Sequence, residues 1–132
     1  MLLAIALGGA AGSVARHLLG SWVATRTTGI PWGTLVVNVT GSLLLGFVAR
    51  SLAGRPHSPA LAAALTVGFC GGYTTFSAFS LETVLLLERG AWARALLYAL
   101  ASVAVCVGGA AVGVALAPGS GATIAAAPAR EP

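Results

Sequence analysis

Four long apolar blocks constrain the fold of this chain of 132 residues more than any other feature. Each block is long enough to cross a hydrocarbon core of roughly 30 Å as a helix, at about 1.5 Å per residue. The sequence therefore predicts an all-α membrane protein, with a single four-helix transmembrane domain over residues 1–117 and a disordered tail over 118–132. The predicted helices cover approximately 2–24, 33–53, 60–87 and 94–116.

The composition excludes several classes of protein. Hydrophobic residues make up 58% of the chain and charged residues only 8%, whereas a soluble domain carries about 25% charge. The connections between the blocks are six to eight residues long, which leaves no room for an extramembrane catalytic or nucleic-acid-binding domain. We therefore expect no enzyme and no nucleic-acid partner, and we expect the functional chemistry to lie within the bilayer.

The basic residues are balanced between the two ends of the predicted helices. If four helices alternate in direction, each side of the membrane receives three arginines: Arg50, Arg55 and the distant Arg130 of the tail on one side, and Arg26, Arg89 and Arg94 on the other. An imbalance of such residues normally sets the orientation of a membrane protein. Its absence predicts insertion in both orientations and an antiparallel homodimer, in which a two-fold axis in the membrane plane produces an inverted repeat.

A glycine stripe with one arginine runs along the first block. Gly8, Gly12, Arg16 and Gly20 recur every four residues, so they share one face of a helix, and we expect this face to contact protein. An arginine at this depth is a functional candidate, although it could also extend to the interface. His17 lies on a neighbouring face and receives no assignment.

Polar side chains recur every four residues in the second and fourth blocks. Asn38 is the most polar of the second set, and its amide offers two N–H donors and one acceptor. It could line a polar path or bond a neighbouring helix. In the fourth block, Tyr98 and Ser102 form a hydroxyl row that Cys106 continues, which suits either a hydrated path or interhelical hydrogen bonding.

The third block contains a predicted break near the centre of the membrane. Gly71 and Gly72 are followed by Tyr73 and two β-branched residues, Thr74 and Thr75, a poor sequence for a helix interior. Broken helices at this depth occur at ion sites. In an antiparallel dimer two such breaks could meet on the axis, where carbonyl oxygens from both chains would suit a hard monovalent cation.

Two phenylalanines follow the break. Phe76 and Phe79 are three residues apart, with Ser77 and Glu82 close by. Such pairs are usually packing residues, but a ring presented edge-on can also favour an anion without a full charge. Glu82 could pair with an arginine or line a vestibule.

Three motifs now carry a resemblance to a known family. The segments GGAAGSVARH, PWGTLVVNVTGSLLLGF and, above all, GFCGGYTTFSAFSLE resemble the Fluc (CrcB) family of fluoride channels over residues 8 to about 113. The resemblance implies a dual-topology antiparallel homodimer in the bacterial inner (plasma) membrane, with two fluoride pores and a structural sodium ion at its centre. It implies passive fluoride efflux, and no nucleotide motif is present.

The resemblance also implies roles for individual residues. The fluoride pathway would contain Asn38, Phe76, Phe79, Ser77, Tyr98 and Ser102. Arg16 and Glu82 would lie at a vestibule, and the backbone carbonyls of Gly71 and Thr74 would hold the sodium ion. This chain departs from the family pattern at Cys106, where a hydroxyl would continue the polar row, and at Ala78, where a threonine is frequent.

Two alternative functions remain at this point. A small dual-topology, proton-coupled multidrug exporter would share the size and charge balance, but it needs an acidic residue deep in its first helix, where this chain has Arg16. A non-transporting assembly subunit would account for the glycine stripes. It would leave the broken third helix and the Asn-Phe-Phe set without a purpose.

Overall fold

All regular structure in the described residues, 1–53 and 55–118 of this computed structural model, is helical. The predicted tail lies outside the described residues except for Pro118. Four helical segments in the described residues are long and apolar enough to cross a membrane, which confirms the predicted four-helix fold. Three of the spans are single helices, α1 (Leu2–Ala24), α2 (Trp32–Leu52) and α6 (Trp92–Leu116). The third span in chain order consists of four pieces: α3 (Pro59–Ala63), the π-helix η1 (Ala64–Cys70), α4 (Gly71–Tyr73) and α5 (Phe76–Glu88).

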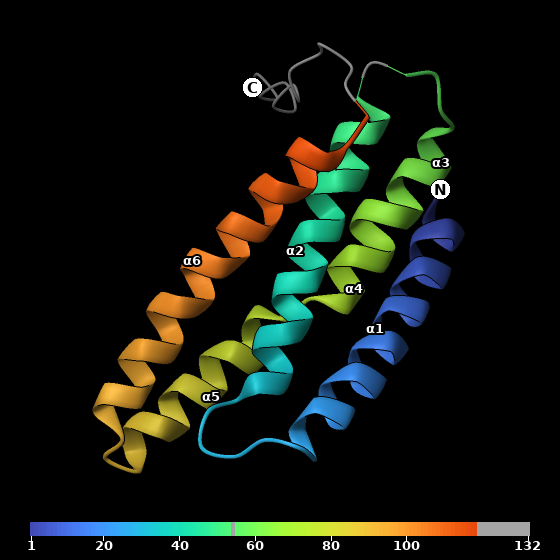
Figure 1. Cartoon of the computed structure of the whole chain (residues 1–132). Helices are drawn as coiled ribbons and strands as arrows, with labels where there is room; N and C mark the ends of the chain where they lie inside the picture. The colour runs from blue at the N-terminus through green and yellow to red at the C-terminus, as the bar shows by residue number, and fades with distance from the viewer. Residues whose placement is uncertain (54, 119–132) are drawn as a thin grey trace, which may run out of the picture.

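The four spans alternate in direction (Figure 1). The start of α1 and the end of α6 therefore lie at one end of the bundle, and the α1–α2 and α5–α6 turns lie at the other. Each of these two turns contains a glycine with positive φ, 87° at Gly29 and 70° at Gly90. Glycine adopts this backbone conformation without strain, and Gly90 follows the last residues of α5 directly, so it ends that helix sharply, whereas Gly29 lies within the α1–α2 turn.

The third span changes its packing partner at its break. Its first half, α3 with η1, packs mainly against α1, whereas α5 packs against α6. Helix α2 contacts α1, η1, α4, α5 and α6 and so bridges the two halves of the bundle. Helix α4, just before the break, packs mainly against α1 and also touches α2, whereas α1 and α5 diverge beyond the break (Figure 1).

The glycine stripe of α1 packs against protein, as the sequence predicted, with Gly8 and Gly12 facing the third span and Gly20 facing α2. A Cβ atom added at Gly8 would lie 2.3 Å from the Ala64 carbonyl oxygen, and one at Gly12 would lie 2.2 Å from the Phe69 carbonyl oxygen. Both distances are far below a van der Waals contact, so only glycine permits this approach of the two backbones. Close packing through small residues is the usual way in which helices associate in a membrane.

A second glycine seam joins α2 to α6, and it supports a prediction on stability. A Cβ atom at Gly113 would lie 2.0 Å from the Leu43 carbonyl oxygen, whereas nothing lies within 4 Å of one at Gly108, on the same helix. We expect Gly113→Val to lower the free energy of unfolding by about 1–3 kcal/mol, because α2 must move away from α6 to make room for the side chain. Gly108→Val is the matched control. Thermal unfolding in detergent measures both, and equal losses would show that close packing at Gly113 is not the cause.

Candidate functional site

The break in the third span lies at Thr74 and Thr75. Their backbones are extended, with φ and ψ of −81° and 159° at Thr74 and −150° and 111° at Thr75. Gly71, with φ −65° and ψ −38°, is still helical, so the break falls beyond the glycine pair. The β-branched threonines favour the extended conformation. The Thr75 hydroxyl accepts from the Ala78 N–H at 3.1 Å, which caps the start of α5.

Asn38 on α2 binds the broken backbone through both ends of its amide. Its Nδ2 donates to the Thr75 carbonyl at 3.0 Å, and its Oδ1 accepts from the Thr75 N–H at 2.8 Å. Backbone groups freed within a membrane must be satisfied by protein. Interhelical bonding, one of the two interpretations of Asn38, is therefore confirmed. The amide has two N–H groups and uses one of them here, so the second remains for another acceptor.

The carbonyl oxygens at the end of α4 differ in their partners. The Ser13 hydroxyl lies 3.4 Å from the Gly72 oxygen, and Arg16 Nη1 lies 3.4 Å from the Thr74 oxygen, both long hydrogen bonds. In a continuous helix the Thr75 N–H would donate to the Gly71 oxygen, but here it donates to Asn38. The Gly71 oxygen has thus lost its helical donor.

Glu82 on α5 accepts two short hydrogen bonds. Its Oε1 accepts from the Thr34 hydroxyl and its Oε2 from the Tyr98 hydroxyl, each at 2.7 Å. The carboxylate is therefore held by hydroxyl groups from α2 and α6 rather than by an arginine. The part played by Thr34 was missed, although its place one helical turn before Asn38 was visible in the sequence.

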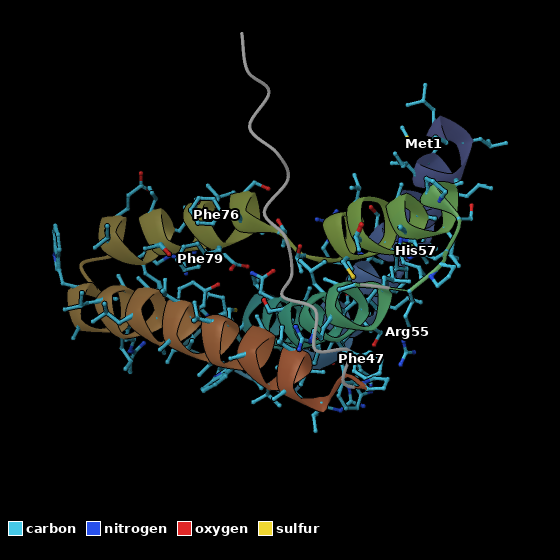
Figure 2. All side chains as sticks on the ribbon, turned by 90° about the horizontal axis from the view of Figure 1, so that it is seen from above. Met1, Phe47, Arg55, His57, Phe76 and Phe79 are labelled. Carbon is cyan, nitrogen blue, oxygen red and sulfur yellow. The ribbon has the colours of Figure 1, made fainter. Side chains whose placement is uncertain are left out.

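The aromatic side chains form a row from the surface of α5 to the interior. Ring centroids are 5.4 Å apart for Phe76 and Phe79 and 5.3 Å apart for Phe79 and Tyr98, both pairs tilted. Phe79 lies between α5 and α6, while Phe76 lies on the outer side of α5 (Figure 2) and is 78% exposed. The edges of these rings carry partial positive charge. The structure thus brings together Phe76, Phe79, Tyr98 and Glu82.

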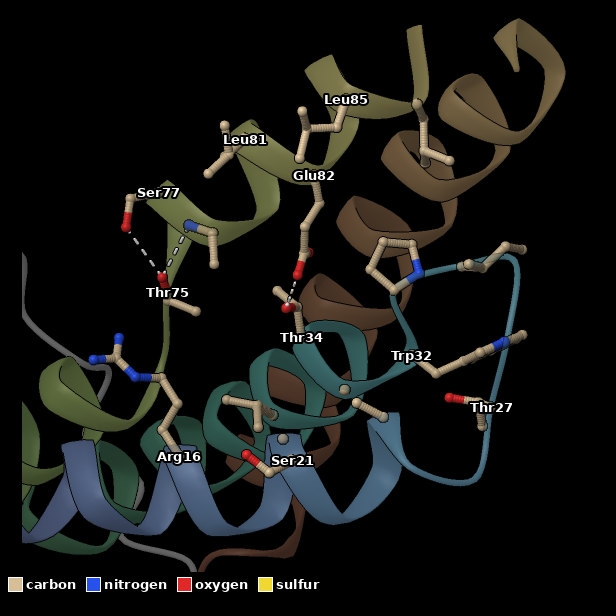
Figure 3. Close-up of a pocket in the computed structure, with 18 of the residues that line it drawn as sticks. Arg16, Ser21, Thr27, Trp32, Thr34, Thr75, Ser77, Leu81, Glu82 and Leu85 are labelled. Carbon is tan, nitrogen blue, oxygen red and sulfur yellow. Dashed lines mark hydrogen bonds between the residues drawn. The ribbon is translucent and has the colours of Figure 1, made fainter. Parts of the chain in front are cut away.

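A pocket of about 940 Å³ opens where α1 and α5 diverge beyond the break (Figure 3). Liquid water takes roughly 30 Å³ per molecule, so this volume accommodates a hydrated ion. Arg16 lines it from α1, and Ser77 and Glu82 line it from α5. The two residues assigned to a vestibule therefore lie on the same pocket, together with His17, Thr34 and Arg89.

Ser102 differs from the other predicted pathway residues because its side chain forms no hydrogen bond or ring contact within the described residues. It is buried on α6 one helical turn after Tyr98, and its hydroxyl has no hydrogen-bond partner within the described residues. A buried hydroxyl without a partner is uncommon and requires an explanation.

No hydrogen bond joins Asn38 to the row of aromatic side chains formed by Phe76, Phe79 and Tyr98. These are therefore two neighbouring groups of polar and aromatic residues rather than one network.

The fold and the site define a class. This is a small multi-pass membrane protein whose broken third helix is held open by a polar side chain, the architecture of membrane ion sites. The chain belongs to the CrcB family, since residues 3–114 match the family described as "CrcB-like protein, Camphor Resistance (CrcB)".

Relatives from several bacteria cover most of the chain. It is 50% identical over 118 residues to the "Fluoride-specific ion channel FluC" of Nitrobacter winogradskyi, which covers 86% of this chain and 91% of that protein. It is 48% identical over 122 residues to the protein of the same name from Rhodospirillum centenum, covering 88% and 94%. The protein of that name from Geobacter sulfurreducens is 49% identical over 115 residues, covering 86% and 93%.

Proposed function

We propose that this chain is the subunit of a fluoride-selective ion channel that lowers cytoplasmic fluoride by passive efflux across the bacterial plasma membrane. The observation that carries the proposal is its 50% identity, over 86% of its length, to a protein named as a fluoride-specific ion channel. Hydrogen fluoride enters a cell as a neutral acid and ionises inside. The inside-negative potential then drives fluoride out through an open path, without nucleotide or proton coupling.

The chemistry of the site supports an anion of this kind. Fluoride is small and strongly hydrated, so it must exchange water for hydrogen-bond donors throughout its path. Asn38 keeps one N–H beyond the one that it gives to Thr75, and the buried Ser102 hydroxyl has no partner in the described residues. The Ser77 hydroxyl and the ring edges of Phe76 and Phe79 would complete the path. None of these groups carries a fixed positive charge that would trap the ion.

We propose further that the channel is an antiparallel homodimer. Phe76, which is 78% exposed in one chain, would then be covered by the partner. The tryptophans add a second argument, because Trp22, Trp32 and Trp92 all lie beside the α1–α2 and α5–α6 turns, at one end of the bundle. Tryptophans normally line both membrane interfaces. Two antiparallel copies would supply them to both.

The carbonyl oxygens at the break support a structural sodium ion at the centre of this dimer. Gly71 is exposed in one chain, and its carbonyl has lost its helical donor to Asn38. Such oxygens suit a hard monovalent cation, and the fit is good at Gly71. The Thr74 carbonyl would be the second ligand, although it shares a 3.4 Å contact with Arg16. A cation bound by carbonyl oxygens of both chains would hold the broken third span of one chain against that of its partner.

Substitution of the two adjacent glycines tests the dimer and the cation site together. A Cβ atom at Gly72 would lie 2.5 Å from the Gly9 carbonyl oxygen, while the nearest such atom to one at Gly71 is 3.9 Å away. We expect Gly72→Val to disrupt the folded chain and Gly71→Val to preserve its helix content but weaken pairing. Circular dichroism and size-exclusion chromatography in detergent measure both effects. A Gly71→Val protein with unchanged pairing would argue against a partner at this position.

The phenylalanines give a test of ring electrostatics. Isoleucine keeps much of the bulk of phenylalanine but has no ring quadrupole. We expect Phe76→Ile and Phe79→Ile each to reduce fluoride efflux at least about tenfold, the loss of roughly 1.4 kcal/mol of transition-state stabilisation. Phe79 packs on Tyr98 within the chain and Phe76 would be covered by the partner, so the thermal unfolding of each variant is compared with that of the original protein. Normal efflux in both variants would make the rings packing residues.

Fluoride efflux from liposomes tests the function as a whole. Purified protein should release fluoride on addition of a potassium ionophore and should release no chloride under the same conditions. Proton-coupled drug uptake with no fluoride flux would favour the exporter instead. The absence of any flux would favour an assembly subunit.

A further inference from the structure

We propose that Asn38 is a positioning residue for the central cation, in addition to its place in the fluoride path. The inference rests on the proposed function, because it assumes the antiparallel pair and its cation site. By accepting the Thr75 N–H, Asn38 keeps the Gly71 carbonyl free to bind a cation.

The hydrogen bonds at the break show where the helix gives up its regular pattern. The Thr74 N–H still donates to the Cys70 carbonyl at 3.0 Å, as in a helix. The next bond in the series, from Thr75 to Gly71, is replaced by the 2.8 Å bond from Thr75 to Asn38 Oδ1. Without Asn38 the Thr75 N–H would lack an acceptor, which is unfavourable inside a membrane. The Gly71 carbonyl is the acceptor that the regular helix pattern offers it.

The other end of the Asn38 amide holds the same residue in place. Its Nδ2 donates to the Thr75 carbonyl at 3.0 Å, so both backbone groups of Thr75 are fixed by one side chain. One turn further along α2, a Cβ atom at Gly41 would lie only 2.3 Å from Thr74 Cγ2. Helix α2 therefore packs tightly against the break at Gly41 and is hydrogen-bonded to it at Asn38. Movement of the break away from Asn38 is restricted.

This arrangement links two ions through one amide. The acceptor end of Asn38 prepares the cation site, and its second N–H remains for an anion. The two ends can be separated by mutation. Aspartate keeps an oxygen that accepts the Thr75 N–H but places a carboxylate beside the anion path, whereas leucine has a similar size and removes both interactions.

The experiment measures the sodium-dependent rise in unfolding temperature of the purified full-length protein in detergent, in sodium chloride against N-methylglucamine chloride at equal ionic strength. A ligand that binds only the folded state raises this temperature with its concentration. We expect Asn38→Asp to keep the sodium response, with a half-saturating sodium concentration no higher than about twice that of the original protein, because its oxygen still accepts the Thr75 N–H and its charge attracts a cation. We expect Asn38→Leu to raise it at least about tenfold, as the loss of a single hydrogen bond to a buried group would. Ser42→Ala, one turn along α2, is the matched control and should change nothing.

Each outcome decides the proposal. A normal sodium response in Asn38→Leu, or a lost response in a folded Asn38→Asp, would overturn it. If Asn38→Leu does not fold, Asn38→Ala, which adds no bulk, takes its place with the same expectation. If the original protein conducts fluoride but shows no sodium response, the cation site and this inference both fail while the channel function stands.

Discussion

Replacing Asn38 with aspartate abolishes fluoride efflux in liposomes, on our expectation, while the protein remains folded. The substitution removes the Nδ2 donor that binds the Thr75 carbonyl at 3.0 Å and the second N–H that remains for an anion. It also places a like charge beside the fluoride path, and two unit charges 4 Å apart repel by about 4 kcal/mol at an effective dielectric constant of 20. That energy corresponds to roughly a thousandfold in rate.

The measurement compares fluoride release from liposomes with the same protein density. Ser42→Ala is the control, because it removes a hydroxyl from the same helix, one turn away from Asn38. Circular dichroism and size-exclusion chromatography show whether the variant is folded and paired. If Asn38→Asp releases fluoride at the original rate, then Asn38 is solely a structural residue of the break.

Fixing the orientation of the chain should have an equally large effect. Counting Arg130 of the tail with those in or beside the loops, three arginines lie on each side of the membrane, so a few added positive charges should decide the orientation. Two or three lysines added to the α1–α2 turn should place that turn in the cytoplasm in every copy. An antiparallel pair could not then form, and we expect fluoride efflux to be lost.

Co-expression gives the decisive comparison. A second gene with lysines added to the connection at residues 55–58 should insert in the opposite orientation, and the two variants together should restore fluoride resistance in cells. Reporter fusions to the C-terminus verify the orientation of each. Full activity from a single locked orientation would exclude the antiparallel dimer.

The amino-acid sequence by itself determined the fold class and the position of the break to within a few residues. Four apolar blocks of membrane-spanning length leave few alternatives to a helical bundle, because unsatisfied backbone groups are not tolerated in lipid. The glycine stripe of α1 was visible for a similar reason. Residues four apart share a helix face, so their pattern alone shows that Gly8 and Gly12 lie together.

Only the tertiary structure decided which backbone atoms are free at the break. The sequence indicated that the glycine pair unwinds, but the structure keeps Gly71 helical and opens the chain at Thr74 and Thr75. Gly72 is instead required by the close approach of Gly9. That approach depends on a segment some sixty residues away, which local sequence preference does not contain.

The partners of the polar side chains were likewise decided by the tertiary structure. Asn38 could be recognised as polar and placed on a helix face, but its two bonds to Thr75 depend on how α2 packs against the third span. Thr34 and Tyr98 come from two different helices and meet at Glu82. Their separation along the chain hides this contact, since periodicity reports which residues share a face and not which faces meet.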